Sequence, residues 1–162
     1  MKTMLNNVLH PFSTPERALK ILMTMVFLVP VLFGIYIFLT LAREELTFSE
    51  YLYQSSWNNL LFLNVLMNLV WTYILIKMYP GTDKETDFEY IGFILWILFI
   101  SQIFVSNIFL AFLAGITLYK IRAGFRQSMS VQLFLRNKTV SIMALSLLFF
   151  SLLSGFALIR TV

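Results

Sequence analysis

Amides and hydroxyls are the most polar side chains within the apolar stretches of this chain. Asn64 and Asn68 are four residues apart and therefore share one face of a helix. Gln102 and Ser106 share a second face, and Asn107 belongs to the face beside it. An amide in hydrocarbon needs a hydrogen-bond partner, so these residues either join helices or line a path for an ion or polar solute. Helix joining is the favoured interpretation, because one polar strip on one helix does not define a pore.

Groups suited to acid–base, redox or metal chemistry are scarce. The chain has no cysteine, and His10 is its single histidine. The alternating acids Asp83, Glu85, Asp87 and Glu89 offer the oxygen ligands that calcium prefers, but the glycine and spacing of an EF-hand loop are missing. We therefore expect no catalytic residue, no cofactor and no metal site.

Small residues form two patterns that favour close approach of helices. Each pattern contains a pair of small residues four positions apart, with a further alanine on the same side. The candidate packing or partner residues are Ala111, Ala114, Gly115, Ala144, Ser151 and Gly155. The spacing leaves open whether these faces join helices of one chain or of two chains.

A basic segment over residues 120–138 interleaves cationic and apolar side chains. This composition predicts an amphipathic connection that lies against anionic lipid headgroups or against a protein partner. Its cationic residues are Lys120, Arg122, Arg126, Arg136 and Lys138.

The distribution of charged residues along the chain predicts the helices that contain these residues. Of the 162 residues, 59% are hydrophobic and only 12% are charged, against about 25% charged in a soluble domain. Four uncharged stretches of 22, 26, 30 and 21 residues each exceed the roughly 18 to 20 residues that cross a bilayer as a helix. Two crossings need roughly 40 residues, so the 30-residue stretch predicts one long, tilted helix. The sequence thus predicts an all-α integral membrane protein, a four-helix transmembrane bundle forming one membrane domain over 1–162, with spans at about 19–42, 56–79, 91–119 and 139–160.

Several residues have the types and spacing that begin helices. Thr14 precedes a proline and an acid, and Thr47 with Glu50 has the spacing of a capping box, so the second helix is expected to begin near Phe48. Asn137 is suited to cap the last helix.

One residue pair predicts an irregularity in the first helix. Pro30 removes an amide donor, and Gly34 follows one turn later, so we expect a kink there. A gating hinge at this kink is a further hypothesis.

The orientation of four spans cannot be chosen from their charges. Six basic residues fall on the side of the N-terminus and six on the opposite side. The first group is Lys2, Arg17, Lys20, Lys77, Lys84 and Arg160, and the second is Arg43 together with the five basic residues of 120–138.

These features favour a non-catalytic accessory or scaffolding subunit of a larger membrane protein complex. The alternative is a small homo-oligomeric channel or transporter whose path is lined by the five polar residues, and a weaker alternative is a membrane immunity or sensor protein. The expected location is the bacterial cytoplasmic membrane. The expected partners are the lipid bilayer and other membrane subunits or further copies of this chain. Nucleic acid is not expected as a partner, since basic residues in the loops of a membrane protein commonly give a net charge such as the +4 of this chain.

Overall fold

The computed structural model describes residues 12–79, 87–128 and 130–161, and in these residues all regular structure is helical. The longer helices are α2 (Pro15–Glu44), α4 (Ser56–Met78), α5 (Phe88–Phe104), α6 (Ile108–Lys120) and α9 (Lys138–Thr161). The short helices are α3 (Phe48–Gln54), α7 (Phe125–Ser128) and α8 (Val131–Arg136). The all-α prediction is therefore confirmed.

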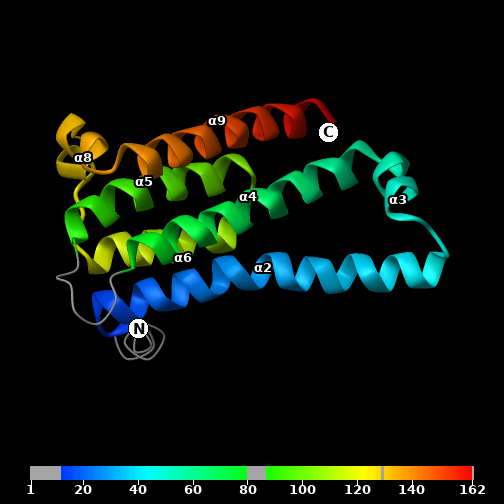
Figure 1. Cartoon of the computed structure of the whole chain (residues 1–162), viewed down its shortest axis with the longest axis horizontal. Coiled ribbons are helices and arrows are strands. Elements are labelled where there is room, and N and C mark those ends of the chain that lie inside the picture. The colour runs from blue at the N-terminus through cyan, green and yellow to red at the C-terminus, as the bar shows by residue number, and fades with distance from the viewer. Residues whose placement is uncertain (1–11, 80–86, 129, 162) are drawn as a thin grey trace, which may run out of the picture.

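Three helices are long and apolar enough to cross a membrane: α2, α4 and α9. They match the spans expected at 19–42, 56–79 and 139–160. The helix α2 continues through Pro30 and Gly34 without interruption (Figure 1), so the proline does not break it. The kink expected at Pro30, and a hinge at this position, stay predictions.

The single helix expected over 91–119 is wrong, because this stretch forms the two helices α5 and α6. They are joined at Val105, Ser106 and Asn107 and pack along each other as a hairpin. At 1.5 Å per residue α5 is about 25 Å long and α6 about 20 Å long, so each is shorter than a hydrocarbon core of about 30 Å. The bundle thus consists of three long helices and one short hairpin, in place of four full spans.

Side-chain caps fix several helix starts where the sequence indicates them. The Thr14 hydroxyl accepts from the backbone N–H of Arg17 at the start of α2, and Asn137 Oδ1 accepts from Val140 at the start of α9. At α3 the capping box of Thr47 and Glu50 is complete.

The second predicted helix is interrupted before its apolar part. Ser55 is extended, with φ −157° and ψ 137°, and its hydroxyl accepts from the backbone N–H of Trp57. This cap ends the continuity between α3 and α4, so α3 is a separate short helix that joins α2 to α4.

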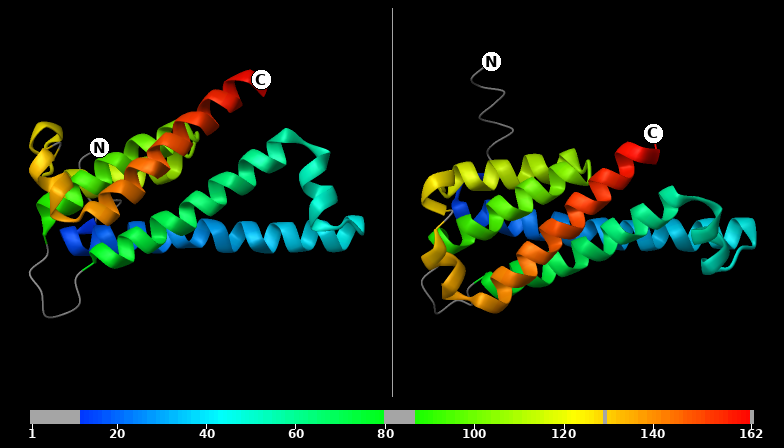
Figure 2. Two further views of the ribbon diagram at one scale, coloured as in Figure 1. Left: turned by 45° about the horizontal axis from the view of Figure 1, so that its top comes forward. Right: turned by 90° about the horizontal axis from the view of Figure 1, so that it is seen from above.

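The helices place the connections at two opposite ends of the molecule (Figures 1 and 2). At one end lie α7, α8, the starts of α2, α5 and α9, and the ends of α4 and α6. We call this the α8 end. At the opposite end, the α3 end, lie α3 and the end of α9. The hairpin starts and finishes at the α8 end and turns back between the two ends.

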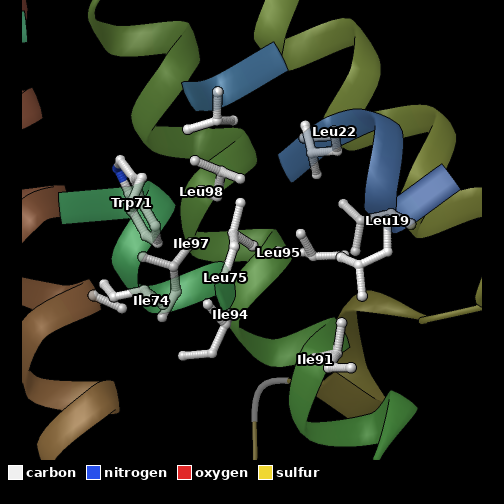
Figure 3. Close-up of a cluster of buried hydrophobic side chains, with 14 of the residues drawn as sticks. Leu19, Leu22, Trp71, Ile74, Leu75, Ile91, Ile94, Leu95, Ile97 and Leu98 are labelled. Atoms are coloured by element: carbon white, nitrogen blue, oxygen red, sulfur yellow. The ribbon is translucent and has the colours of Figure 1, made fainter. Parts of the chain in front are cut away.

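The core lies where α5 packs against α4, α6 and α9 and where α2 packs against α4 and α6. Leucine and isoleucine side chains fill it, together with the buried Trp71 of α4 (Figure 3). Its fully buried members include Leu19 and Leu22 of α2, Ile74 and Leu75 of α4, and Ile91, Ile94, Leu95 and Leu98 of α5. Since this core is built around the hairpin, it belongs mainly to the α8 half of the molecule.

Candidate functional site

The buried amides form a polar contact between α4 and the hairpin. Asn68 and Gln102 are each only 2% exposed, and Gln102 Nε2 donates to Asn68 Oδ1 over 3.1 Å. Thr72, one turn along α4, donates its hydroxyl to the backbone oxygen of Asn68 over 2.8 Å. The expectation that Asn68 joins helices thus agrees with its hydrogen bond.

Two further polar contacts tie α9 to the same region. The hydroxyls of Ser101 and Ser151 are hydrogen-bonded to each other, which joins α5 to α9. The Ser154 hydroxyl donates to Asn64 Oδ1 over 3.0 Å, which joins α9 to α4. Hydrogen bonds between polar side chains therefore join α4, α5 and α9 to one another.

Two atoms of this polar region have no partner in the described part of the chain. They are Trp71 Nε1 and Gln102 Oε1, both buried. Gln102 is itself a member of the Asn68–Gln102 contact, and Trp71 is three residues beyond Asn68 on α4, on the neighbouring part of the same helix face. A buried polar atom without a partner costs about 1 to 3 kcal/mol, so the Asn68–Gln102 contact is energetically incomplete.

Ser106 and Asn107 have a different role from the other polar candidates, since they form the turn of the hairpin. Ser106 is left-handed, with φ 57°, and the backbone N–H of Asn107 donates to the Gln102 oxygen over 2.9 Å. Asn107 then caps α6, because its Oδ1 accepts from the backbone N–H of Leu110. The five polar candidates thus divide into three interhelical amides and two turn residues.

The small-residue faces are used for packing within the chain. Ala111, Ala114, Ala144, Ser151 and Gly155 are buried. A Cβ on Gly155 would lie 2.6 Å from the backbone oxygen of Phe104, and a Cβ on Gly115 would lie 3.4 Å from the ring of Phe99. Small side chains here let α9 approach the end of α5 and let α6 approach its middle. The contacts of Gly115 and Gly155 lie between helices of this chain, and a contact of these faces with a second chain stays a prediction.

An apolar groove of about 710 Å³ lies beside the turn of the hairpin. On one side it is lined by Ile103, Phe104 and Ser106, and on the other by five residues of α9: Leu152, Gly155, Phe156, Leu158 and Ile159. Of these residues, only Ser106 and Gly155 are candidates that could be predicted from the sequence. Exposed apolar side chains occur all along a membrane-facing helix, so the sequence carries no signal that separates the groove from a lipid-facing surface.

The basic segment folds back on the start of α5. Trp96 of α5 donates its Nε1 hydrogen to the Ala123 oxygen over 3.0 Å, and Arg136 of α8 pairs with Asp87 over 2.8 Å. Asp87 also caps α5 through its Oδ1 and the backbone N–H of Tyr90. Of the five cationic candidates, only Arg136 has an ion pair in the described residues.

The structure describes two of the four acids considered as calcium ligands, Asp87 and Glu89. Asp87 is used in the cap and ion pair just described, whereas Asp83 and Glu85 lie outside the described residues, as does His10. Within the described ranges no group of three or more histidine, cysteine, aspartate or glutamate residues is arranged to hold a metal ion.

Comparisons with protein-family models, with curated proteins and with solved structures find no match for this chain.

Proposed function

We propose that this chain is a non-catalytic subunit of a larger membrane assembly. In this proposal α2, α4 and α9 cross the bilayer, and the α5–α6 hairpin enters and leaves it from one side. The observation that carries the proposal is the apolar groove at the turn of the hairpin.

The short hairpin explains why this groove exists. The helix α9 packs along α5 as far as Gly155, which lies beside Phe104, the last residue of α5. Beyond that point no further turn of α5 covers α9, and the side chains of Phe156 and Ile159 are exposed there, as is that of Leu152 just before it. An apolar helix of a partner subunit fits this place, because it would continue the path that a full third span would follow. Dispersion contacts between closely packed helices would then stabilise the assembly.

The polar contacts favour this function over a channel. Asn64, Asn68 and Gln102 are each hydrogen-bonded to a neighbouring helix. Asn107 is occupied in capping α6. The side-chain oxygens of Asn64 and Asn68 accept these bonds, so they are occupied in holding the bundle together and do not replace the hydration shell of a passing ion.

Affinity purification from native membranes in mild detergent, with mass spectrometry of the bound proteins, tests this function. Phe156→Ala removes a ring that is 57% exposed in the groove, and Phe112→Ala removes a ring that is 61% exposed on α6, outside it. We expect other membrane subunits to be recovered in stoichiometric amounts with the wild type and with F112A, and severalfold less with F156A.

The same purification defines the contrary result. Recovery of the chain alone as a homo-oligomer, or equal recovery of partners with F156A and F112A, would contradict the proposal. Thermal unfolding in detergent checks that both variants are folded, because each loses an exposed ring of equal size.

A further inference from the structure

The hairpin changes which basic residues share a side of the molecule. Because α6 returns to the α8 end, the segment after it lies at the same end as the start of α2 and the end of α4 (Figures 1 and 2). Eight of the ten described basic residues are therefore at the α8 end: Arg17, Lys20, Lys77, Lys120, Arg122, Arg126, Arg136 and Lys138. The even division expected for four spans does not apply to this fold.

The two ends also differ in net charge. The described acids at the α8 end are Glu16, Asp87 and Glu89, which against eight basic residues leave a charge of +5. The α3 end has the basic residues Arg43 and Arg160 and the acids Glu44, Glu45 and Glu50, a charge of −1.

Seven of the eight described cations at the α8 end are exposed, and all but Arg136 form no ion pair with a described carboxylate. Among the described residues the only ion pair is that of Arg136 and Asp87. Lys20 and Lys77 lie over the rings of Tyr79 and Tyr73. The remaining charges on α6, α7 and the start of α9 are available to an anion from outside the chain.

A recess of about 410 Å³ at this end offers hydrogen-bond donors beside one of these charges. It lies between the start of α5, the end of α6 and α8, and Arg122, Ser128, Ser130 and Gln132 contribute to its lining together with Glu89. A guanidinium with nearby hydroxyls and an amide is a donor set that suits phosphate oxygens, and it competes here with the Glu89 carboxylate of the same lining, which repels an anion.

The backbone at Arg122 closes α6 and places this residue in the lining of the recess. Its φ is 55°, and the N–H of Ala123 donates to the Leu118 oxygen over 3.2 Å, so Arg122 occupies the left-handed position that usually holds glycine after a helix.

We propose that the α8 end is a surface for the anionic headgroups of membrane lipids, with a lipid phosphate in the recess beside Arg122. Together with the excess of basic residues, this places the α8 end at the cytoplasmic leaflet, where anionic lipids gather and basic loops are retained. The inference rests on the proposed hairpin topology.

Electron spin resonance with spin-labelled lipids tests this surface directly. The full chain is reconstituted into vesicles of phosphatidylcholine, and the fraction of motionally restricted label is compared for spin-labelled phosphatidylglycerol and spin-labelled phosphatidylcholine. We expect a severalfold preference for phosphatidylglycerol, and we expect high salt to reduce it because exposed charges are screened.

Two double variants locate the preference. R122Q/R126Q lowers the net charge of the α8 end from +5 to +3 and should reduce the preference, whereas R43Q/R160Q removes the same charge from the α3 end and should leave it intact. Equal restriction of the two lipids by the wild-type chain, an unchanged preference in R122Q/R126Q, or a matching loss in R43Q/R160Q would overturn the proposal. These results do not depend on recovery of a partner subunit, so they can fail while the proposed function stands.

Discussion

Three residues with left-handed backbone, Glu45, Ser106 and Arg122, each follow the end of a helix. At Glu45 the next N–H, that of Leu46, donates to the Leu41 oxygen, and at Ser106 the N–H of Asn107 donates to the Gln102 oxygen. These bonds satisfy backbone carbonyl groups that the end of a helix leaves unpaired. An unpaired carbonyl group in hydrocarbon would cost free energy, because no water is present to hydrogen-bond it. The turn at Ser106 is therefore a chain reversal with its own hydrogen bonds.

Ser106→Gly tests the hairpin turn at the residue scale. Glycine adopts positive φ without steric cost, so this change should raise the free energy of unfolding by up to about 1 kcal/mol. Ser146→Gly is the matched control, because Ser146 is an exposed serine inside α9 and should lose about 0.5 kcal/mol. Denaturant unfolding in micelles measures both. If 91–119 were one continuous helix, both substitutions would destabilise the protein.

At the residue scale, side-chain caps could be predicted and left-handed positions could not. Thr14, Thr47 and Asn137 cap helices as their sequence neighbours indicate, because a cap depends on contacts within one turn. The left-handed positions lack the glycine that usually marks them, so Ser106 gave no sign of a helix end. Asn107 was the one available signal, as asparagine favours the start of a helix.

At the scale of elements, close packing at Gly155 sets the distance between α9 and the end of α5. A methyl group there would meet the Phe104 oxygen, so Gly155→Ala should lower the free energy of unfolding by about 1 to 3 kcal/mol. Gly34→Ala is the control, since nothing lies within 4 Å of a Cβ at that position and alanine favours a helix. The thermal unfolding temperature should fall for G155A and rise for G34A. Equal stability of G155A and the wild type would contradict this contact.

The bond between Asn68 and Gln102 should appear as coupling between α4 and α5. Asn68→Leu leaves both polar atoms of Gln102 buried without a partner and should cost about 1 to 3 kcal/mol. Adding Gln102→Leu should recover part of this loss, with a coupling of about 0.6 to 1.7 kcal/mol. The free energies of unfolding of the two single variants and the double variant measure it. Ser146→Ala combined with Asn68→Leu should be additive, and additivity of the Asn68–Gln102 pair as well would count against the bond.

At this scale the sequence located the three long helices within a few residues, because length and absence of charge determine them. It did not reveal the hairpin, since an uncharged stretch of 30 residues is compatible with one tilted helix or with two short ones that turn back inside the bilayer. The residues that pack against Gly115 and Gly155 could not be predicted either, because they depend on which helices come into contact after the chain reverses direction.

For the whole molecule, the hairpin determines topology. It brings residues 120–138 to the side where α2 begins, and thereby gives one end an excess of positive charge. The sequence alone left the orientation undecided because the count assumed that residues 91–119 form one helix, whereas the fold has two helices there.

Chemical labelling of single cysteines tests the central claim, the hairpin that enters and leaves the bilayer on one side, most directly. The chain contains no native cysteine, so Glu16→Cys, Tyr53→Cys and Leu135→Cys can each be read without background. All three positions are exposed, at the start of α2, in α3 and in α8. A membrane-impermeant maleimide is applied to intact cells and to inverted vesicles. We predict that residues 16 and 135 react from the same, cytoplasmic side and residue 53 from the other, whereas labelling of residue 135 together with residue 53 would contradict the hairpin and restore four crossings.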